Sequence, residues 1–95
     1  MRNEFNLPEI KLTYNQKLIF DVLTKEFNGK AFGPQMLDES ENDRLKDLTI
    51  KQITWNMLRL RESGLIESEK KSYKGRILNE YKITPIVALE AIIIK

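Results

Sequence analysis

Residues 48–66 read LTIKQITWNMLRLRESGLI, and this stretch contains the signals that decide the fold. Thr49 is a good N-cap, and Gln52 three positions later completes a capping box, so a helix is predicted to begin at Ile50. Gly64 is predicted to end this helix, because glycine adopts the left-handed conformation without a Cβ clash.

This predicted helix has two contrasting faces. The apolar face is expected in the core and comprises Ile50, Ile53, Met57 and Leu60. The opposite face is polar, basic and aromatic, and it comprises Lys51, Gln52, Trp55 and Arg59. Such a face suits a helix lying in the major groove of DNA. The alternative is a solvated face with Trp55 packed on a neighbouring element. Leu58 lies between the two faces and is expected to pack under the wing or the preceding helix.

Residues 65–83 follow the helix and predict a β-hairpin, the wing. Gly75 supplies the turn residue within the stretch 72–75. Apolar side chains at positions of one parity predict an apolar strand face, made of Ile77, Tyr81 and Ile83. The tip is basic, with Lys70, Lys71, Lys74 and Arg76. A charged tip also serves solubility, but after a capped basic helix it favours DNA binding.

The spacing of these residues resembles the winged helix-turn-helix of PadR-type and related MarR-type regulators. The matching positions are Ile53, Met57, Leu60, Gly64, Leu65, Ile66, Gly75, Arg76, Tyr81, Ile83 and Thr84, with the stretch FGPQML at 32–37 similar to the start of that family's second helix. The chain departs from the family at Thr54, where tyrosine is usual. The size is also similar to small archaeal plasmid or viral DNA binders, including PadR-like partition proteins that bind a centromere and spread along DNA.

The composition limits the class of protein. Ninety-five residues make one domain, and the absence of cysteine fits an intracellular protein without disulfides. Histidine is absent too, which removes the commonest general base and metal ligand. No phosphate loop, dinucleotide fingerprint or metal-ligand cluster is present. The sequence therefore predicts a protein that is not an enzyme and needs no cofactor or metal. Without a bilayer-spanning run or a signal peptide, we expect a cytoplasmic protein with no membrane partner.

Positive charge is concentrated in one part of the chain. The net charge is only +2, but residues 44–82 contain ten basic and five acidic side chains. A local basic surface of this kind is typical of contacts with phosphate. The sequence therefore places the predicted DNA contacts in the helix that begins at Ile50 and in the wing.

A first helix is predicted from about Tyr14 to Phe27. Thr13 and Gln16 form a second capping box at its start. Its expected core positions are Leu18, Ile19, Val22 and Leu23. Phe20 and Phe27 lie off this stripe, which indicates a second contact for that side of the helix.

A short strand and a second helix are predicted next. Residues 30–32 suit the strand, and Gly33-Pro34 opens the helix with proline in the tolerated first turn. Met36 and Leu37 are expected to point inward. The acidic run 38–43 lacks the spacing of a calcium-binding loop, so it is interpreted as a solvated helix end or turn.

The two ends of the chain are interpreted as interaction segments. Residues 1–12 are expected to form an N-terminal arm, residues 13–84 the winged helix-turn-helix domain, and residues 85–95 a C-terminal helix that is apolar almost all round. Such a helix needs covering on more than one side, and a homodimer would cover it. The expected interface comprises Phe20, Phe27, Ile86, Leu89, Ile92 and Ile93. The alternative is a strand-like tail tucked into the monomer.

The fold prediction is therefore a mainly α winged helix-turn-helix with a β-hairpin wing. The predicted function is site-specific binding of double-stranded DNA by a homodimer on an inverted repeat, as a transcriptional regulator. Gln52 and Arg59 are expected to read bases, Thr49 and Thr54 to hold phosphates, and the wing to hold the flanking backbone or the minor groove. Two alternatives stay open: a plasmid partition protein that spreads on DNA through dimer–dimer contacts, and a winged helix that binds a protein partner through Trp55.

Overall fold

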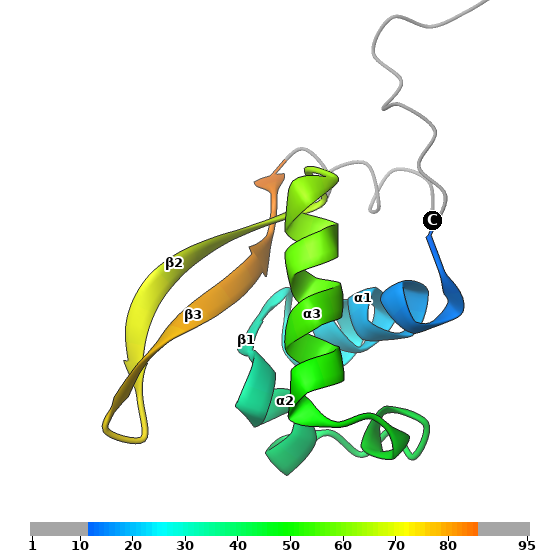
Figure 1. Ribbon diagram of the computed structural model, residues 1–95, viewed down its shortest axis with the longest axis horizontal. Helices are drawn as coiled ribbons and strands as arrows, with labels where there is room; N and C mark the ends of the chain where they lie inside the picture. The colour runs from blue at the N-terminus through cyan, green and yellow to red at the C-terminus, as the bar shows by residue number, and fades with distance from the viewer. Residues whose placement is uncertain (1–11, 86–95) are drawn as a thin grey trace, which may run out of the picture.

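The computed structural model describes residues 12–85 as three α-helices, a short 3-10 helix and a three-stranded antiparallel sheet (Figure 1). In chain order the elements are α1 (Tyr14–Glu26), β1 (Lys30–Phe32), α2 (Gly33–Glu39), η1 (Leu45–Asp47), α3 (Ile50–Glu62), β2 (Ile66–Tyr73) and β3 (Arg76–Ile83). The strand order is β1-β3-β2. This arrangement is that of a winged-helix-like fold. The predictions for the N-terminal arm up to residue 11 and for Ile86, Leu89, Ile92 and Ile93 lie outside the described residues.

Both predicted capping boxes are present. Thr49 Oγ1 accepts a hydrogen bond from the Gln52 amide at 3.1 Å, and Gln52 Oε1 accepts one from the Thr49 amide at 2.8 Å. The same exchange joins Thr13 and Gln16 at the start of α1. Each box satisfies backbone donors that the first helical turn leaves unpaired. The sequence therefore predicted the first residues of both long helices correctly.

The end of α3 is fixed by a glycine. Gly64 has φ +83°, and its amide donates to the Arg61 carbonyl at 3.0 Å. The next amide, of Leu65, donates to the Leu60 carbonyl at 3.2 Å, which completes a Schellman motif. This turn directs the chain from the end of α3 straight into β2.

Every element contributes to a single core. The buried cluster comprises Ile19, Val22, Leu23, Ala31, Met36, Leu45, Ile53, Met57, Leu60, Ile66 and Tyr81. Leu58, the predicted flank residue, is half-buried and packs against this cluster. Because α3 is held by only one of its faces, the opposite face is left to solvent.

Two residues expected in the apolar core are exposed, so that part of the prediction is wrong. Ile50 begins α3 and is 38% exposed, because the first turn of the helix extends past the core. Ile77 is 69% exposed, because it lies near the end of the wing, beyond the part of β3 that pairs with β1. The strand pattern was right in parity, since Tyr81 is buried and Ile83 packs on the core.

The wing is a hairpin with a two-residue turn. Tyr73 pairs with Arg76, and Lys74 and Gly75 between them have φ values of +52° and +78°. Positive φ at both positions is what a type I′ turn requires, and this turn matches the twist of the flanking strands. Gly75 is therefore confirmed as a turn residue, but the turn runs from Tyr73 to Arg76, one residue later than the predicted stretch 72–75.

Gly33 sets how closely α2 approaches α3. A Cβ atom at this position would lie 3.0 Å from Thr54 Oγ1 and 3.3 Å from Ile50 Cδ1. Glycine therefore allows the first turn of α2 to seat directly on α3. This contact also turns Thr54 toward α2, where its side chain is half-buried.

Candidate nucleic-acid interface

One face of α3 carries polar and aromatic side chains into solvent. We name this the exposed face of α3, and it comprises Lys51, Gln52, Trp55 and Arg59. Trp55 is 56% exposed, which is unusual for so large an apolar side chain. The Arg59 guanidinium lies 4.8 Å from the centre of the Trp55 ring. Because stacking limits the rotamers of Arg59, its planar group is partly preorganised for a planar hydrogen-bonding partner.

The predicted roles of Gln52 and Thr49 compete with the helix cap. A bidentate contact with adenine uses both the oxygen and the nitrogen of a glutamine side chain. The oxygen of Gln52 already accepts the Thr49 amide. Thr49 accepts through its hydroxyl oxygen, so its hydroxyl proton stays available to a phosphate. The structure thus leaves Arg59 as the better base-reading candidate of the predicted pair.

A hollow of about 640 Å³ lies beside the exposed face of α3. It is lined by Asn15, Ile50, Lys51, Gln52, Thr54, Trp55, Asn56 and Leu58. The lining thus combines predicted DNA contacts with two aliphatic side chains, Ile50 and Leu58. Asn15 could not be assigned to this hollow from the sequence, because it comes from the first turn of α1 and not from α3.

The wing carries its own countercharges. Glu69 and Glu80 are directly opposite each other on β2 and β3, an arrangement that is unfavourable for two carboxylates. Lys71 lies 3.5 Å from Glu69 and 3.7 Å from Glu80, and Lys82 lies 3.3 Å from Glu69. The hydrogen bond and the charge of Lys82 hold the pKa of the Glu69 carboxyl below its usual range. These lysines therefore offset carboxylates of the wing itself.

The wing tip contacts α2. Lys74 Nζ donates to Asp38 Oδ2 at 3.0 Å, and the hydrogen bond to Asp38 raises the pKa of Lys74. The rings of Tyr73 and Phe32 stack, with centres 4.7 Å apart. Sequence reasoning missed Asp38 as a partner, since it lies 36 residues from Lys74.

Lys70 and Arg76 differ from the other wing cations. Both are exposed, and neither forms an ion pair with another residue of the described part of the chain. Lys70 is on the strand face shared with Ile66 and Tyr81, which is the face that packs on the helices. Arg76 pairs with Tyr73 across the turn and lies on the other face. Of the four predicted wing contacts, these two have the freest cationic groups.

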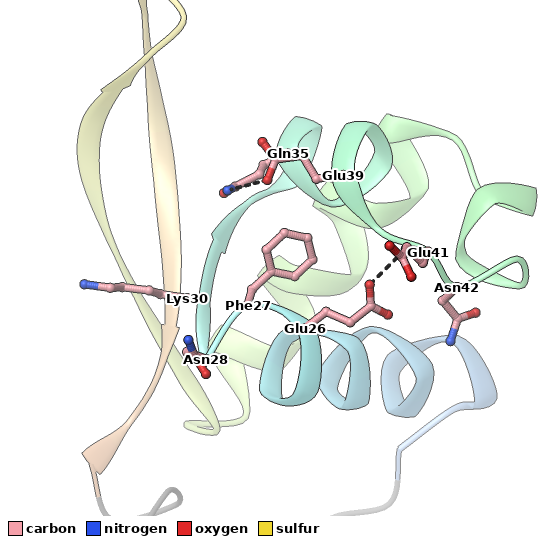
Figure 2. Close-up of a pocket in the computed structure, with 8 residues that line it drawn as sticks. All are labelled: Glu26, Phe27, Asn28, Lys30, Gln35, Glu39, Glu41 and Asn42. Carbon is pink, nitrogen blue, oxygen red and sulfur yellow. Dashed lines mark hydrogen bonds between the residues drawn. The ribbon is translucent and has the colours of Figure 1, made fainter.

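A second hollow, of about 760 Å³, lies between the end of α1, β1 and α2 (Figure 2). Phe27 points into the space between these elements, and Glu26 accepts a hydrogen bond from the Glu41 amide at 3.0 Å. Glu39, also in the lining, accepts one from Gln35 at 3.1 Å. Three carboxylates in its lining make this surface a poor match for phosphate.

Two of the predicted dimer-interface residues, Phe20 and Phe27, lie in the described part of the chain, and only part of each side chain is accessible to a second subunit. Phe20 and Phe27 are half-buried and pack against the core of their own subunit. This explains why both aromatics lie off the main stripe of α1 without requiring a second subunit. The dimer stays a prediction.

The described residues include neither a membrane-spanning helix nor a metal-binding cluster. No helix between residues 12 and 85 is both long and apolar enough to cross a membrane. Over the same residues, no group of carboxylates is arranged to hold a metal ion. Within the acidic run, Asn42 has a structural role: its Oδ1 accepts hydrogen bonds from the amides of Arg44 and Leu45 at the start of η1.

Comparison with known proteins gives one informative likeness. The fold is similar to that of Stf76 from the Sulfolobus islandicus plasmid-virus pSSVx, with a TM-score of 0.56 and 16% sequence identity. The match covers 84% of this chain and 94% of that chain. No protein-family model matches the chain, and no curated protein does. The structural likeness thus extends to the arrangement of helices and wing, and the PadR-type assignment stays a prediction.

Proposed function

We propose that the protein binds double-stranded DNA through α3 and the wing. The observation that carries this proposal is the exposed face of α3, where Arg59 stacks on a Trp55 that is itself 56% exposed. A helix that is packed on one side and presents basic and hydrogen-bonding groups on the other fits a major groove.

The contacts divide by role. Arg59 reads a base edge, because a guanidinium fork matches the two acceptors of guanine. Lys51 and the Thr49 hydroxyl hold phosphates beside it, while Lys70 and Arg76 hold the backbone that flanks the groove. Gln52 contributes through its amide nitrogen, since its oxygen serves the helix cap. Thr54, turned toward α2, is the least available of the predicted contacts.

We further propose that a homodimer binds an inverted repeat and regulates transcription. A two-fold dimer would place two copies of α3 about one helical turn apart on the DNA. The partition alternative uses the same contacts but adds dimer–dimer contacts along the DNA. Footprinting on one site with long flanking DNA separates the two, because a partition protein would extend its protection past the site.

A protein-interaction function is the second candidate, and the hollow beside Trp55 favours it. An exposed tryptophan next to aliphatic side chains has the composition of an interface hot spot. In that case the basic wing would be merely solvated.

The test is a salt series of binding to random duplex DNA and to inverted repeats taken from upstream of the protein's own gene. Tight, salt-sensitive binding with one repeat strongly preferred is the expected result for a site-specific DNA binder. Absence of binding even at low salt would overturn the proposal in favour of the protein-interaction alternative.

A further inference from the structure

The outer half of the wing extends beyond the three-stranded sheet. β1 pairs only with residues 80–82 of β3, so residues 70–79 form a two-stranded ribbon. A two-stranded hairpin by itself is marginally stable in water. The position of its tip must therefore depend on contacts with other elements.

Two such contacts converge on one place. The Tyr73 ring stacks on Phe32, the last residue of β1, at an angle of 25° between the ring planes. Beside it, Lys74 reaches Asp38 in α2, and its ammonium group lies 5.3 Å from the centre of the Tyr73 ring. Phe32 is itself buried, so the ring on which Tyr73 stacks is held in place at the end of β1. Both contacts hold the same turn against the same end of the helix-turn-helix.

The backbone at Lys74 gives an independent reason to assign it a role. Lys74 has φ +52° at the first position of a type I′ turn, where asparagine and glycine are favoured. A lysine costs conformational energy there, because its Cβ is crowded in the left-handed region. The lysine side chain is long enough to reach Asp38 from the turn, whereas an asparagine side chain is too short.

We propose that Lys74 and Asp38 form a latch that holds the wing tip against α2. Lys74 is then a positioning residue, and the phosphate contacts of the wing are made by Lys70 and Arg76. This second part rests on the DNA-binding function proposed above. An exposed ion pair contributes little energy, so the latch biases the position of the tip and does not lock it.

The latch is tested first without DNA, by measuring backbone order parameters of the Gly75 and Arg76 amides by NMR. The variants are Lys74→Asn, which suits the turn better than lysine, and Asp38→Asn. Asp43→Asn is the matched control, because Asp43, in the segment between α2 and η1, is an exposed carboxylate that forms no ion pair among residues 12–85. Both latch variants should lower the order parameters from the rigid range near about 0.85 toward about 0.6, and the control should not. Unchanged order in both latch variants would overturn the proposal.

The second test measures duplex DNA binding across a salt series. Lys74→Asn and Asp38→Asn should each weaken binding about twofold to fivefold with an unchanged salt slope, and the swapped pair Asp38→Lys with Lys74→Asp should restore it. If Lys74 instead contacts a phosphate, Lys74→Asn lowers the slope of log affinity against log salt concentration by about 0.9. In that case Asp38→Asn strengthens DNA binding, and the swapped pair does not restore wild-type affinity. Wild-type protein that does not bind DNA would refute the proposed function, while the order parameters would still decide the latch.

Discussion

The exposed face of α3 and the wing are both basic, but their cations differ in what they contact. Lys51 and Arg59 form no ion pair with any residue between 12 and 85, and Arg59 rests on an aromatic ring instead. In the wing, Lys71, Lys74 and Lys82 each lie within 4 Å of a carboxylate. Counting charges along a chain therefore overstates what the wing can offer to phosphate. The cations of the exposed face of α3 are left to solvent, whereas much of the wing's positive charge is paired with carboxylates.

The largest effect is expected from removing both cations of the exposed face of α3. Lys51→Ala combined with Arg59→Ala should lower duplex affinity by roughly 100-fold, because a bidentate arginine contact with a base is worth about 1–3 kcal/mol and the loss of a phosphate contact at Lys51 adds to it. Fluorescence anisotropy with a labelled duplex measures this at fixed salt. Lys17→Ala combined with Lys25→Ala is the control, since it removes the same charge from the exposed surface of α1. An equal loss in the control would mean that net charge, and no particular surface, governs binding.

Two glycines, one at the contact of α2 with α3 and one in the wing turn, should differ in how much a substitution destabilises the fold. Gly33→Ala should lower the free energy of unfolding by about 2–3 kcal/mol, the upper part of the range for an overpacked site, because the new methyl group presses on Thr54 and Ile50. Gly75→Ala meets no atom within 4 Å and should cost only about 1 kcal/mol, from its left-handed backbone. Urea denaturation measures both. Equal costs would mean that α2 is not seated on α3 as tightly as described.

Trp55 provides a smaller, more specific test of the helix face. Trp55→Ala should weaken DNA binding about fivefold, because Arg59 loses the ring that orients it. The free energy of unfolding should change by no more than about 0.5 kcal/mol, since the side chain is exposed. Trp55→Phe keeps an aromatic face and should recover part of the affinity. An alanine variant that binds DNA as wild type does would remove Trp55 from the interface.

The smallest effect concerns the wing's internal charges. In the folded protein the pKa of the Glu69 carboxyl is lowered, first of all by Lys82. The ion pair therefore stabilises the fold fully at a pH above the pKa that Glu69 has in the unfolded chain. This stabilisation is lost as the pH falls through the lower pKa that Glu69 has in the folded protein. Lys82→Met should therefore raise the Glu69 titration midpoint toward that of an ordinary glutamate. NMR of the side-chain carboxyl carbon follows this directly. A midpoint that does not move would show that Lys82 is not the principal cause.

Local signals made much of this fold predictable. The capping boxes at Thr13 and Thr49, the glycine at 64 and the turn at 75 act within a few residues, so their outcome hardly depends on the rest of the chain. Ile50 was misassigned because periodicity does not reveal where a helix extends past the core. Ile77 was misassigned in the same way, at the far end of the wing.

The candidate site was harder to predict than the fold. The sequence identified the exposed face of α3 through its polarity, but it did not show that the cap would leave only the amide nitrogen of Gln52 available to a ligand. The contact between Lys74 and Asp38 depends on where α2 lies against the wing, which no local pattern encodes. Paired and unpaired lysines look alike in a sequence, and only their neighbours in space distinguish them.

DNA binding through α3 and the wing is tested most directly by an NMR titration of isotope-labelled protein with a short random duplex at low salt. We expect the amide shifts to concentrate on residues 49–59 and on the tip around Lys70 and Arg76. Amides around the hollow at Phe27 should stay in place. Shifts centred on that hollow, or none at all, would contradict the assignment of α3 and the wing as the DNA-binding surface.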